Sequence, residues 1–293
     1  MGHVLEKTIE DVCGPEITIT ERRPVSGGDI NAACVLTLSD GSKVFLKENT
    51  KVPGDYFKAE AKGLLALSSA GVIEIPKVLA EGRDGAVLFL MLSYIRGGAK
   101  KTSFWYDFGR RLALLHKTDT SPFTEGKKYG FSSDNFIGAT RQINTPSDSW
   151  TGFFRSCRLE PQFKAAWGHF DPLMKKKINY LINHLEEWMT EPEYPSLLHG
   201  DLWGGNYMVS QDGSPVLIDP AVYVGNREAD LAMTELFGGF HNDFYSGYED
   251  EAGVPEGYEK RRDLYNLYHM LNHLNLFGGS YMHGVRNIIV RYS

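Results

Sequence analysis

Long apolar stretches are missing from this sequence of 293 residues. The longest apolar run is Ala86–Leu92, and a membrane-spanning helix needs about 20 such residues. The N-terminus also lacks the basic segment followed by an apolar segment that marks a secretion signal. We therefore expect a protein that does not associate with membranes.

Cysteine is scarce, and positive charge is in the minority. Cys13, Cys34 and Cys157 are far apart and odd in number, so they form neither a metal-binding pattern nor a disulfide framework and predict a reducing, cytoplasmic location. The 31 Lys and Arg residues against 37 Asp and Glu give a formal net charge of −6, which argues against a nucleic-acid binder. The sequence leaves the oligomeric state unknown.

Polar side chains are concentrated around a short predicted β-hairpin. Its strands are the apolar runs Asn206–Val209 and Pro215–Ile218, which flank a Gln-Asp-Gly-Ser turn. Asp201 precedes the hairpin and Asp219 ends it, so folding would bring Asp201, Asn206 and Asp219 together. Carboxylate and carboxamide oxygens suit Mg²⁺ better than zinc.

The order of these residues matches the catalytic loop of protein kinases. His199-Gly-Asp201 is followed by Asn206 at the spacing Asp-x-x-x-x-Asn, and Asp219 stands where those enzymes place the Asp of Asp-Phe-Gly. In that template Asp201 accepts the proton of the attacking hydroxyl, and Asn206 and Asp219 hold the metal. The alternative is a surface turn with a capping Asp, because an isolated Asp-x-x-x-x-Asn is common.

The first part of the chain predicts a nucleotide-binding lobe. Lys47 ends an apolar strand, like the Lys that contacts the α- and β-phosphates of ATP in kinases, although a solvated Lys is the commoner fate. Glu60, on the next predicted helix, is the expected partner of Lys47, whereas Glu48 should face the other way. A glycine loop before the strand would bring backbone N–H groups to the phosphates, or else be a plain hairpin loop. Its residues are Gly27, Gly28, Asp29, Ile30 and Asn31.

A hinge is predicted at the end of the next strands, which begin near Ile75 and Ala86. Backbone groups of this hinge would bond the edge of an adenine ring, and its residues are Met91, Leu92, Ser93 and Tyr94. We therefore expect an N-terminal nucleotide-binding lobe at 1–92 and a C-terminal catalytic and substrate-binding lobe at 93–293. Apolar spacing predicts helices at 1–14, 57–67, 104–116, 150–162, 173–189 and 262–277.

The fold class that follows is α+β, with the two lobes of a protein-kinase-like fold. The small N-terminal lobe is an antiparallel sheet with one main helix, and the larger C-terminal lobe is mostly helical. Residues 228–263 are rich in carboxylates, which would steer a cationic substrate toward the protein. Within them Asp230 is expected to cap a helix or to anchor the catalytic loop through backbone amides.

Six segments together resemble the fructosamine kinase (ketosamine-3-kinase) family over nearly the whole chain. They are Gly27-Gly-Asp-Ile-Asn31, Asn135-Phe-Ile-Gly138, His199-Gly-Asp-Leu-Trp-Gly-Gly-Asn206, Ile218-Asp-Pro220, Gly225-Asn-Arg-Glu-Ala-Asp230 and Leu271-Asn-His-Leu-Asn-Leu-Phe-Gly-Gly279. The resemblance implies ATP-dependent phosphorylation of the sugar 3-hydroxyl of ketoamines formed by glycation, either small molecules or glycated proteins. Because the product is unstable, the reaction would free the original amine.

Single residues also give predictions about how such an enzyme binds its substrate and how it is regulated. Trp203, inside the catalytic loop, is predicted to form an apolar wall of the sugar site. Gly200 replaces the Arg that protein kinases place before the catalytic Asp, and no Ala-Pro-Glu segment follows Asp219, which argues against control by activation-loop phosphorylation. Two alternatives stay open: another small-molecule kinase of the aminoglycoside or choline type, and a pseudokinase that only binds nucleotide.

Overall fold

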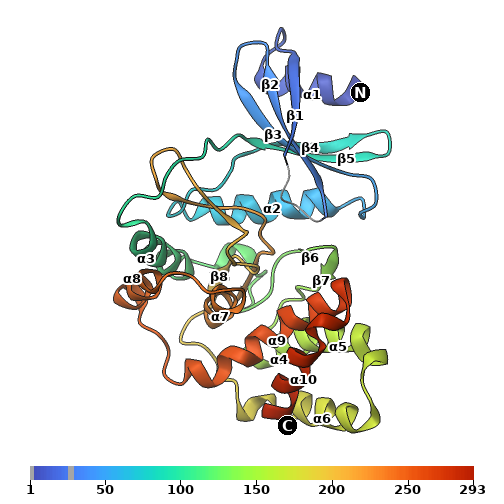
Figure 1. Cartoon of the computed structure of the whole chain (residues 1–293), viewed down its shortest axis with the longest axis vertical. Helices are drawn as coiled ribbons and strands as arrows, with labels where there is room; N and C mark the ends of the chain where they lie inside the picture. The colour runs from blue at the N-terminus through green and yellow to red at the C-terminus, as the bar shows by residue number, and fades with distance from the viewer. Residues whose placement is uncertain (1–2, 26–29) are drawn as a thin grey trace.

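The computed structural model describes residues 3–25 and 30–293 and shows two lobes, one above the other (Figure 1). The N-terminal lobe is a five-stranded antiparallel sheet with the strand order β1-β2-β3-β5-β4. Its strands are β1 (Ile19–Val25), β2 (Ala32–Leu38), β3 (Lys43–Asn49), β4 (Val78–Asp84) and β5 (Val87–Ser93), and its helices are α1 (His3–Cys13) and α2 (Tyr56–Ser69).

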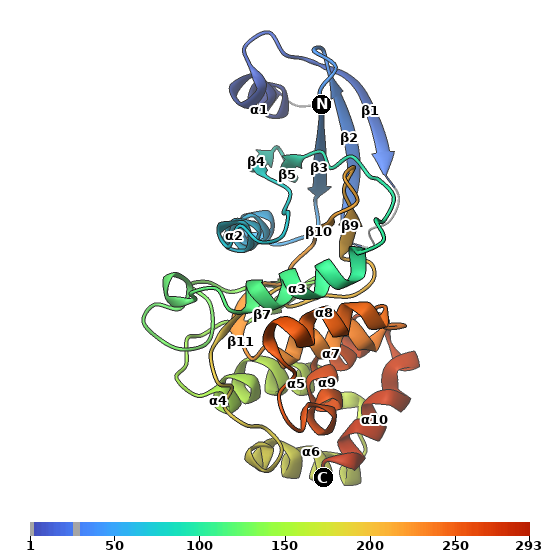
Figure 2. The ribbon, with the colours of Figure 1, turned by 90° about the vertical axis from the view of Figure 1, so that its left-hand side faces the viewer.

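The side chains of β3 and β5 point alternately to the two faces of the sheet, so this lobe has two apolar layers. Val44 and Leu46 of β3 and Met91 of β5 pack with α1, while Leu90 and Leu92 pack with α2. In Figure 2, α1 lies above β4 and β5, and α2 lies below them. Successive side chains of a strand point to opposite faces, so Lys47 lies on the α2 side. The predicted assignment of a small antiparallel sheet with one main helix is confirmed.

β1 contains Pro24, and β4 differs from the prediction. A proline is tolerated in β1 because β1 is an edge strand of the described sheet. β4 begins at Val78 and not near Ile75, because Glu74 forms a bridge with Val216 of the other lobe instead.

The C-terminal lobe is mostly helical, as predicted. Helices α3 (Phe104–His116) and α8 (Asn242–Ala252) lie side by side (Figures 1 and 2). They approach so closely that a Cβ at Gly109 would lie 1.9 Å from the carbonyl oxygen of Phe244. The other helices are α4 (Trp150–Phe154), α5 (Glu160–Ala166), α6 (Pro172–Asn183), α7 (Glu228–Leu236), α9 (Tyr258–Phe277) and α10 (Met282–Arg291).

Two of the predicted long helices are interrupted. The predicted helix 150–162 is α4, a π-helical turn (Arg155–Leu159) and α5 in succession. The widened turn takes in one extra residue and directs the buried Arg158 guanidinium onto the ring of Tyr223 at 4.0 Å. In place of the predicted helix 173–189, the structure has α6, which ends at Asn183, and then the separate 3₁₀ turn Leu185–Glu187.

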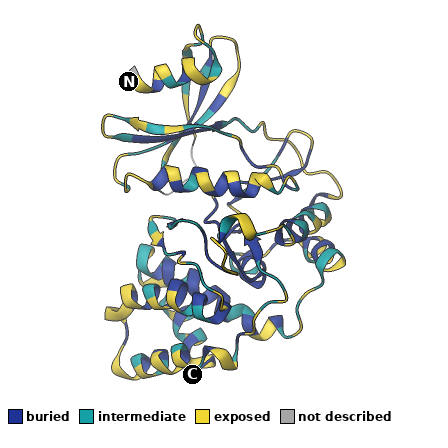
Figure 3. Ribbon diagram, turned by 180° about the vertical axis from the view of Figure 1, so that it is seen from behind, coloured by how far each residue is buried: buried dark blue, intermediate teal, exposed yellow. Residues whose placement is uncertain are grey.

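Three short antiparallel strand pairs lie where the lobes meet. They are β6 (Asn135–Ile137) with β7 (Thr140–Gln142), β8 (Ser196–Leu198) with β11 (Tyr223–Gly225), and β9 (Tyr207–Val209) with β10 (Pro215–Leu217). The β9–β10 pair is the hairpin predicted from the sequence. The helices of the lower lobe expose their outer faces and bury residues toward its centre (Figure 3). No helix within 3–25 and 30–293 has both the length and the apolar character to cross a bilayer.

Candidate active site

The catalytic loop begins where β8 ends, and buried polar contacts hold its backbone. The amide nitrogens of His199 and Gly200 donate to the carboxylate of Asp230 at 2.7 and 2.8 Å. His199 donates from Nε2 to the carbonyl of Ile218 (2.9 Å) and accepts at Nδ1 from the amide of Asp201 (3.3 Å). Burial lowers the pKa of His199, which fits this neutral tautomer. Asp230 therefore anchors the loop, one of the two roles predicted for it.

Gly200 is required by the backbone of this loop. Its φ is +81°, a conformation that side-chain-bearing residues rarely adopt. A Cβ at this position would lie 2.0 Å from the carbonyl oxygen of Ala221. The absence of an arginine before Asp201 thus has a local steric cause.

Asp201 is held by Asn206 and faces a buried histidine. The Asn206 amide nitrogen donates to the carboxylate of Asp201 at 3.0 Å and to its carbonyl at 2.7 Å. On the other side, Nδ1 of His269 lies 4.0 Å from Oδ1 of Asp201. This buried nitrogen has no hydrogen-bond partner among the described residues. Burial, followed by the neighbouring His273, lowers the pKa of His269 to about 3, so the ring is neutral.

The environment of Asp201 favours its protonated form. Burial raises the pKa of its carboxyl to about 7, the hydrogen bond from Asn206 acts in the opposite direction, and the charges of Asp219 and Asp230 add to the rise. A carboxylate with a pKa near neutrality is suited to accepting a proton, because general bases work best when their pKa is close to the working pH.

Lys47 joins the two lobes through two carboxylates. Its Nζ lies 2.5 Å from Glu60 on α2 and 2.5 Å from Asp219. Burial alone would lower the pKa of Lys47, but the two carboxylates outweigh it and the pKa is raised. Glu48 faces away and pairs with Arg22. The predicted pairing of Lys47 with Glu60, and the opposite orientation of Glu48, are both present in the structure.

Asp219 has an unusual backbone conformation. Its φ is +55°, in the left-handed region that few residues other than glycine occupy. Its side chain is 47% exposed, and one carboxylate oxygen contacts Lys47. The rest of the carboxylate is accessible from the space between the lobes.

These side chains surround one cavity between the lobes, with a volume of about 920 Å³. The predicted site residues that line it are Ile30, Asn31, Lys47, Glu60, Leu92, Ser93, Tyr94, Asp201, Trp203, Asn206 and Asp219. Gly27, Gly28 and Asp29 lie outside the described residues. Met91 does not line the cavity, because the alternation of β5 turns its side chain into the core beside α1. The amide of Ser93 is also engaged, since it donates to the carbonyl of Lys77 at 2.8 Å.

Trp203 is part of an aromatic wall on one side of the cavity, and the sequence did not reveal the other residues of this wall. Phe237 packs edge-on against Trp203 (ring centroids 5.9 Å apart) and lies 4.9 Å from His273. His273 in turn lies 5.5 Å from Phe277 and 5.1 Å from Tyr281. All five line the cavity. His273 and Phe277 are one turn apart on α9, and Tyr281 lies in the 3₁₀ turn that follows. This spacing shows that His273 and Phe277 share a helix face, but not that the face lines a cavity.

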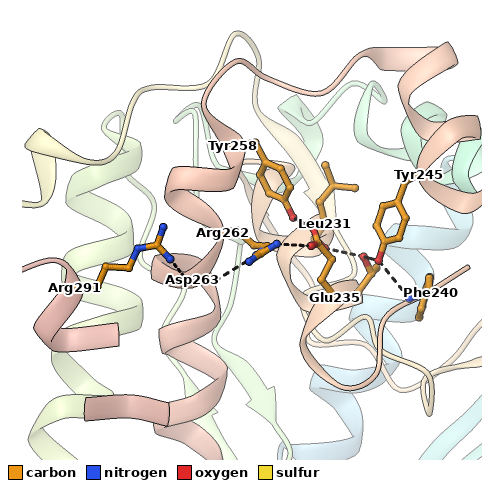
Figure 4. A network of polar contacts seen from close by, with 9 residues as sticks. Leu231, Glu235, Phe240, Tyr245, Tyr258, Arg262, Asp263 and Arg291 are labelled. Atoms are coloured by element: carbon orange, nitrogen blue, oxygen red, sulfur yellow. Dashed lines mark hydrogen bonds and ion pairs between the residues drawn. The ribbon is translucent and has the colours of Figure 1, made fainter. Parts of the chain in front are cut away.

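The acidic segment 228–263, which is predicted to steer a cationic substrate toward the protein, has no carboxylate that lines the described cavity. Several of its carboxylates pair with local partners. Figure 4 shows this for Glu235, which pairs with Arg262, and for Asp263, which pairs with Arg262 and Arg291. The hydroxyl of Tyr258 donates to Glu235. Steering of a cationic substrate by this segment stays a prediction, because a charged surface can act at a distance from the cavity.

A family model described as fructosamine kinase matches residues 1–292. The chain belongs to the fructosamine kinase family. A protein of Synechocystis sp. named "Probable ketoamine kinase" is 40% identical over 291 residues, which cover 97% of this chain and 94% of that protein. A crystal structure of a candidate fructosamine-3-kinase from Haemophilus somnus has a TM-score of 0.87 at 26% identity and covers 98% of this chain and 96% of its own.

The fold of this fructosamine kinase family member extends to more distant kinases. An aminoglycoside phosphotransferase in complex with AMP-PNP and hygromycin B superimposes with a TM-score of 0.66 at 14% identity, covering 98% of this chain and 96% of its own. An identity this low shows the fold alone. The predicted α+β, two-lobed kinase-like fold is confirmed, and so is the predicted family.

Proposed function

We propose that this protein transfers the γ-phosphoryl group of ATP to the 3-hydroxyl of a ketosamine such as fructosyl-lysine. The observation that supports this most is the convergence of Lys47, Asp201 and Asp219 on one cavity between the lobes. In phosphoryl transfer the protein contributes mainly positioning and electrostatic stabilisation. A lysine, a base and metal-binding oxygens are the parts that such a site needs.

Asp201 is the base for the sugar hydroxyl. Its carboxylate lines the cavity, and the hydrogen bond from Asn206 fixes its orientation. Because burial raises its pKa to about 7, Asp201 can take the hydroxyl proton at neutral pH and release it again. Lys47 is the point charge for the nucleotide phosphates, and Glu60 keeps it directed into the cavity.

Asn206 and Asp219 fit the requirements of a magnesium site. Asn206 donates from its amide nitrogen to Asp201, which leaves the amide oxygen for a cation. Asp219 contributes an accessible carboxylate oxygen. Mg²⁺ prefers such hard oxygen ligands, and in kinases it is shared between one or two carboxylates and the nucleotide phosphates. When bound, the ion would neutralise charge that develops on the phosphates.

The adenine is placed against the end of β5 and an apolar slot. Leu92 lines the slot together with Val35, Phe45, Met208 and Ile218. The amide of Ser93 already donates to the carbonyl of Lys77. The backbone groups left for hydrogen bonds with adenine are therefore those that follow the strand, beginning with Tyr94.

The aromatic wall is the place for the sugar and its amine. A ketosamine carries a protonated secondary amine, and aromatic faces attract cations. Trp203 lies two residues after Asp201 in the same loop, so a sugar packed on Trp203 lies within reach of the base. This assignment replaces the acidic segment 228–263 as the receiver of the positive charge.

Phosphorylation of fructosyl-lysine, kanamycin and choline by the same enzyme preparation with Mg²⁺ and ATP tests the proposal. We expect turnover of the ketosamine, with the phosphate on the 3-hydroxyl as read by NMR. Turnover of kanamycin or choline alone would identify a different small-molecule kinase. Nucleotide binding without turnover of any ketoamine would contradict the proposal and favour a pseudokinase.

A further inference from the structure

The chemistry described above does not use the β6–β7 hairpin, residues 135–142, yet this hairpin contacts both lobes. Asn135 and Gln142 lie opposite each other at its base, and Ile137 and Thr140 flank its tip. Figure 1 shows the hairpin at the top of the C-terminal lobe, below α2. Its first four residues, Asn135-Phe-Ile-Gly138, are one of the six segments that resemble the fructosamine kinase family.

The tip of the hairpin holds the first turn of α2. The hydroxyl of Tyr56 donates to the carbonyl of Gly138 at 3.1 Å, and the Tyr56 ring packs on Phe136 at a centroid distance of 4.9 Å. Arg141 forms an ion pair with Asp55, the residue before the helix, at 2.9 Å. The N-terminal end of α2 is therefore tied to the C-terminal lobe by three separate contacts.

This attachment bears directly on Glu60. Residues four apart on an α-helix lie on the same face, one turn apart, so Glu60 is the next residue after Tyr56 on the side that faces the cavity. Both line that cavity. A contact that fixes Tyr56 also fixes how far Glu60 reaches toward Lys47.

The base of the hairpin holds the segment that follows Asp219. The side-chain amide of Asn135 donates to the carbonyl of Val222 at 2.7 Å, and that of Gln142 donates to the carbonyl of Ala221 at 3.0 Å. The two side chains are also bonded to each other at 2.8 Å. Asp219 lies two residues before Ala221, in a left-handed conformation that needs support from its surroundings.

The network at the base is buried and has further partners. Gln142 also accepts from the hydroxyl of Tyr268 at 2.7 Å, and Asn135 accepts from Asn144 at 2.9 Å. Asn135 is 4% exposed and Gln142 is 1% exposed. Buried carboxamides that are satisfied in this way hold a single arrangement, because every alternative leaves polar groups without partners.

We propose that the hairpin 135–142 positions both carboxylate partners of Lys47, Glu60 through α2 and Asp219 through the carbonyls of Ala221 and Val222. The proposal goes beyond the phosphoryl transfer proposed above and rests on its assignment of Lys47 to the nucleotide phosphates. The hairpin residues are positioning residues, since they act through α2 and through the backbone after Asp219. The ion pairs of Lys47 are then already in place before a nucleotide arrives.

Two substitutions at the tip and two matched substitutions elsewhere provide the test. The first variant combines Tyr56→Phe with Arg141→Ala, which removes the hydroxyl bond to Gly138 and the ion pair with Asp55. It also removes the contacts of Arg141 with Asp134 (3.9 Å) and with the ring of Phe136 (5.0 Å), both within the hairpin region. The control combines Tyr292→Phe with Arg286→Ala. The Tyr292 hydroxyl also donates to a backbone carbonyl (2.6 Å), and Arg286 also pairs with an aspartate, Asp171 (2.6 Å). The arginines of the two ion pairs are similarly exposed, 47% and 41%.

Two measurements report on the positioning without any ketoamine. The first is the rate at which fluorosulfonylbenzoyl adenosine, a lysine-directed ATP analogue, modifies Lys47, read by mass spectrometry. The second is amide hydrogen exchange in α2 and in residues 219–224. For the tip variant we expect faster exchange in α2 and a change of about three- to thirtyfold in the modification rate, the size that one hydrogen bond and one exposed ion pair carry. Arg141→Lys alone, which keeps a positive charge beside Asp55, should give values close to those of the wild type.

The base of the hairpin is tested by Asn135→Asp, which keeps the shape but replaces the donor to Val222 with an acceptor. We expect faster amide hydrogen exchange in residues 219–224. We also expect the KM for ATP to rise, relative to the wild type, by a larger factor than the KM for the ketoamine. The proposal is overturned if the tip variant matches the control in both measurements. If Asn135→Asp does not fold, the tip variant decides alone. If Lys47 is not modified even in the wild type, the nucleotide assignment fails, and hydrogen exchange still decides about the hairpin.

Discussion

Replacing Asp201 by asparagine should make the enzyme nearly inactive and at the same time more stable. The amide has the shape of the carboxylate, so its oxygen can still accept from Asn206 (3.0 Å in the wild type) and its nitrogen faces Nδ1 of His269, 4.0 Å away. The substitution therefore removes the base without disturbing its surroundings. Loss of a general base costs about 10²–10⁴-fold in kcat.

The gain in stability follows from the raised pKa of Asp201. Burial raises this pKa from its usual 3.8 to about 7, so the folded state holds a proton that the unfolded state has already released. Burying the carboxylate therefore costs free energy of folding. This cost is zero below about pH 4, grows as the pH rises toward 7, and is constant above about pH 7. Three pH units correspond to about 4 kcal/mol, and we expect about 1–4 kcal/mol because the side chain remains 20% exposed.

The assay pairs single-turnover kinetics with thermal unfolding in the absence of Mg²⁺ and nucleotide. At pH 8 the Asp201→Asn variant should melt several degrees above the wild type, since 1 kcal/mol shifts Tm by about 2–4 °C in proteins of this size range. At pH 4 the two melting temperatures should coincide. A kcat within tenfold of the wild type would refute the assignment of the base. A variant less stable than the wild type at pH 8 would refute the reasoning about burial.

Four further substitutions test other parts of the site. Asp219→Ala should raise the Mg²⁺ concentration needed for half-maximal rate by at least tenfold, because a metal carboxylate is lost; unchanged magnesium dependence would exclude it as a ligand. Glu60→Gln should raise the KM for ATP severalfold, whereas the control Glu48→Gln on the opposite face of β3 should not; the reverse result would contradict the pairing seen here. Trp203→Ala should raise the KM for the ketoamine about tenfold more than the KM for ATP, as steady-state kinetics with both substrates varied will tell. His269→Leu should lower kcat severalfold with little change in either KM, because the polar atom beside the base is lost; His269→Asn, which keeps a nitrogen near that position, should recover most of the rate, and equal rates for the two variants would exclude a polar role.

The catalytic loop could be predicted from the sequence because its residues are close in the chain. Asp201, Asn206 and Asp219 fall within one hairpin and its entry loop, so local geometry brings them together. Lys47 and Glu60 were also predictable, since strand alternation and helix spacing fix which way each faces. These parts depend on short-range rules that a single sequence displays.

The aromatic wall and the hairpin network could not be predicted in the same way. Phe237 follows α7, His273 lies on α9 and Tyr281 lies in the turn after α9. They meet at the cavity only because α7 and α9 pack together, and this packing depends on the whole lobe. The carboxamides of Asn135 and Gln142 are polar residues in a loop-rich stretch, a pattern that predicts exposure. Their partners are backbone carbonyls of another segment, which no residue pattern reveals.

The positive φ of Gly200 also limits how this enzyme could acquire regulation. Protein kinases gain control when a phosphorylated loop pairs with arginines near the catalytic centre. Here any side chain in that position would collide with the carbonyl of Ala221 and be strained as well. Replacing Gly200 by arginine would therefore not, by itself, create a site that binds a phosphorylated loop. It would first need a different path for the chain from Asp219 to Ala221, which would also displace the side chains that we propose as metal ligand and base.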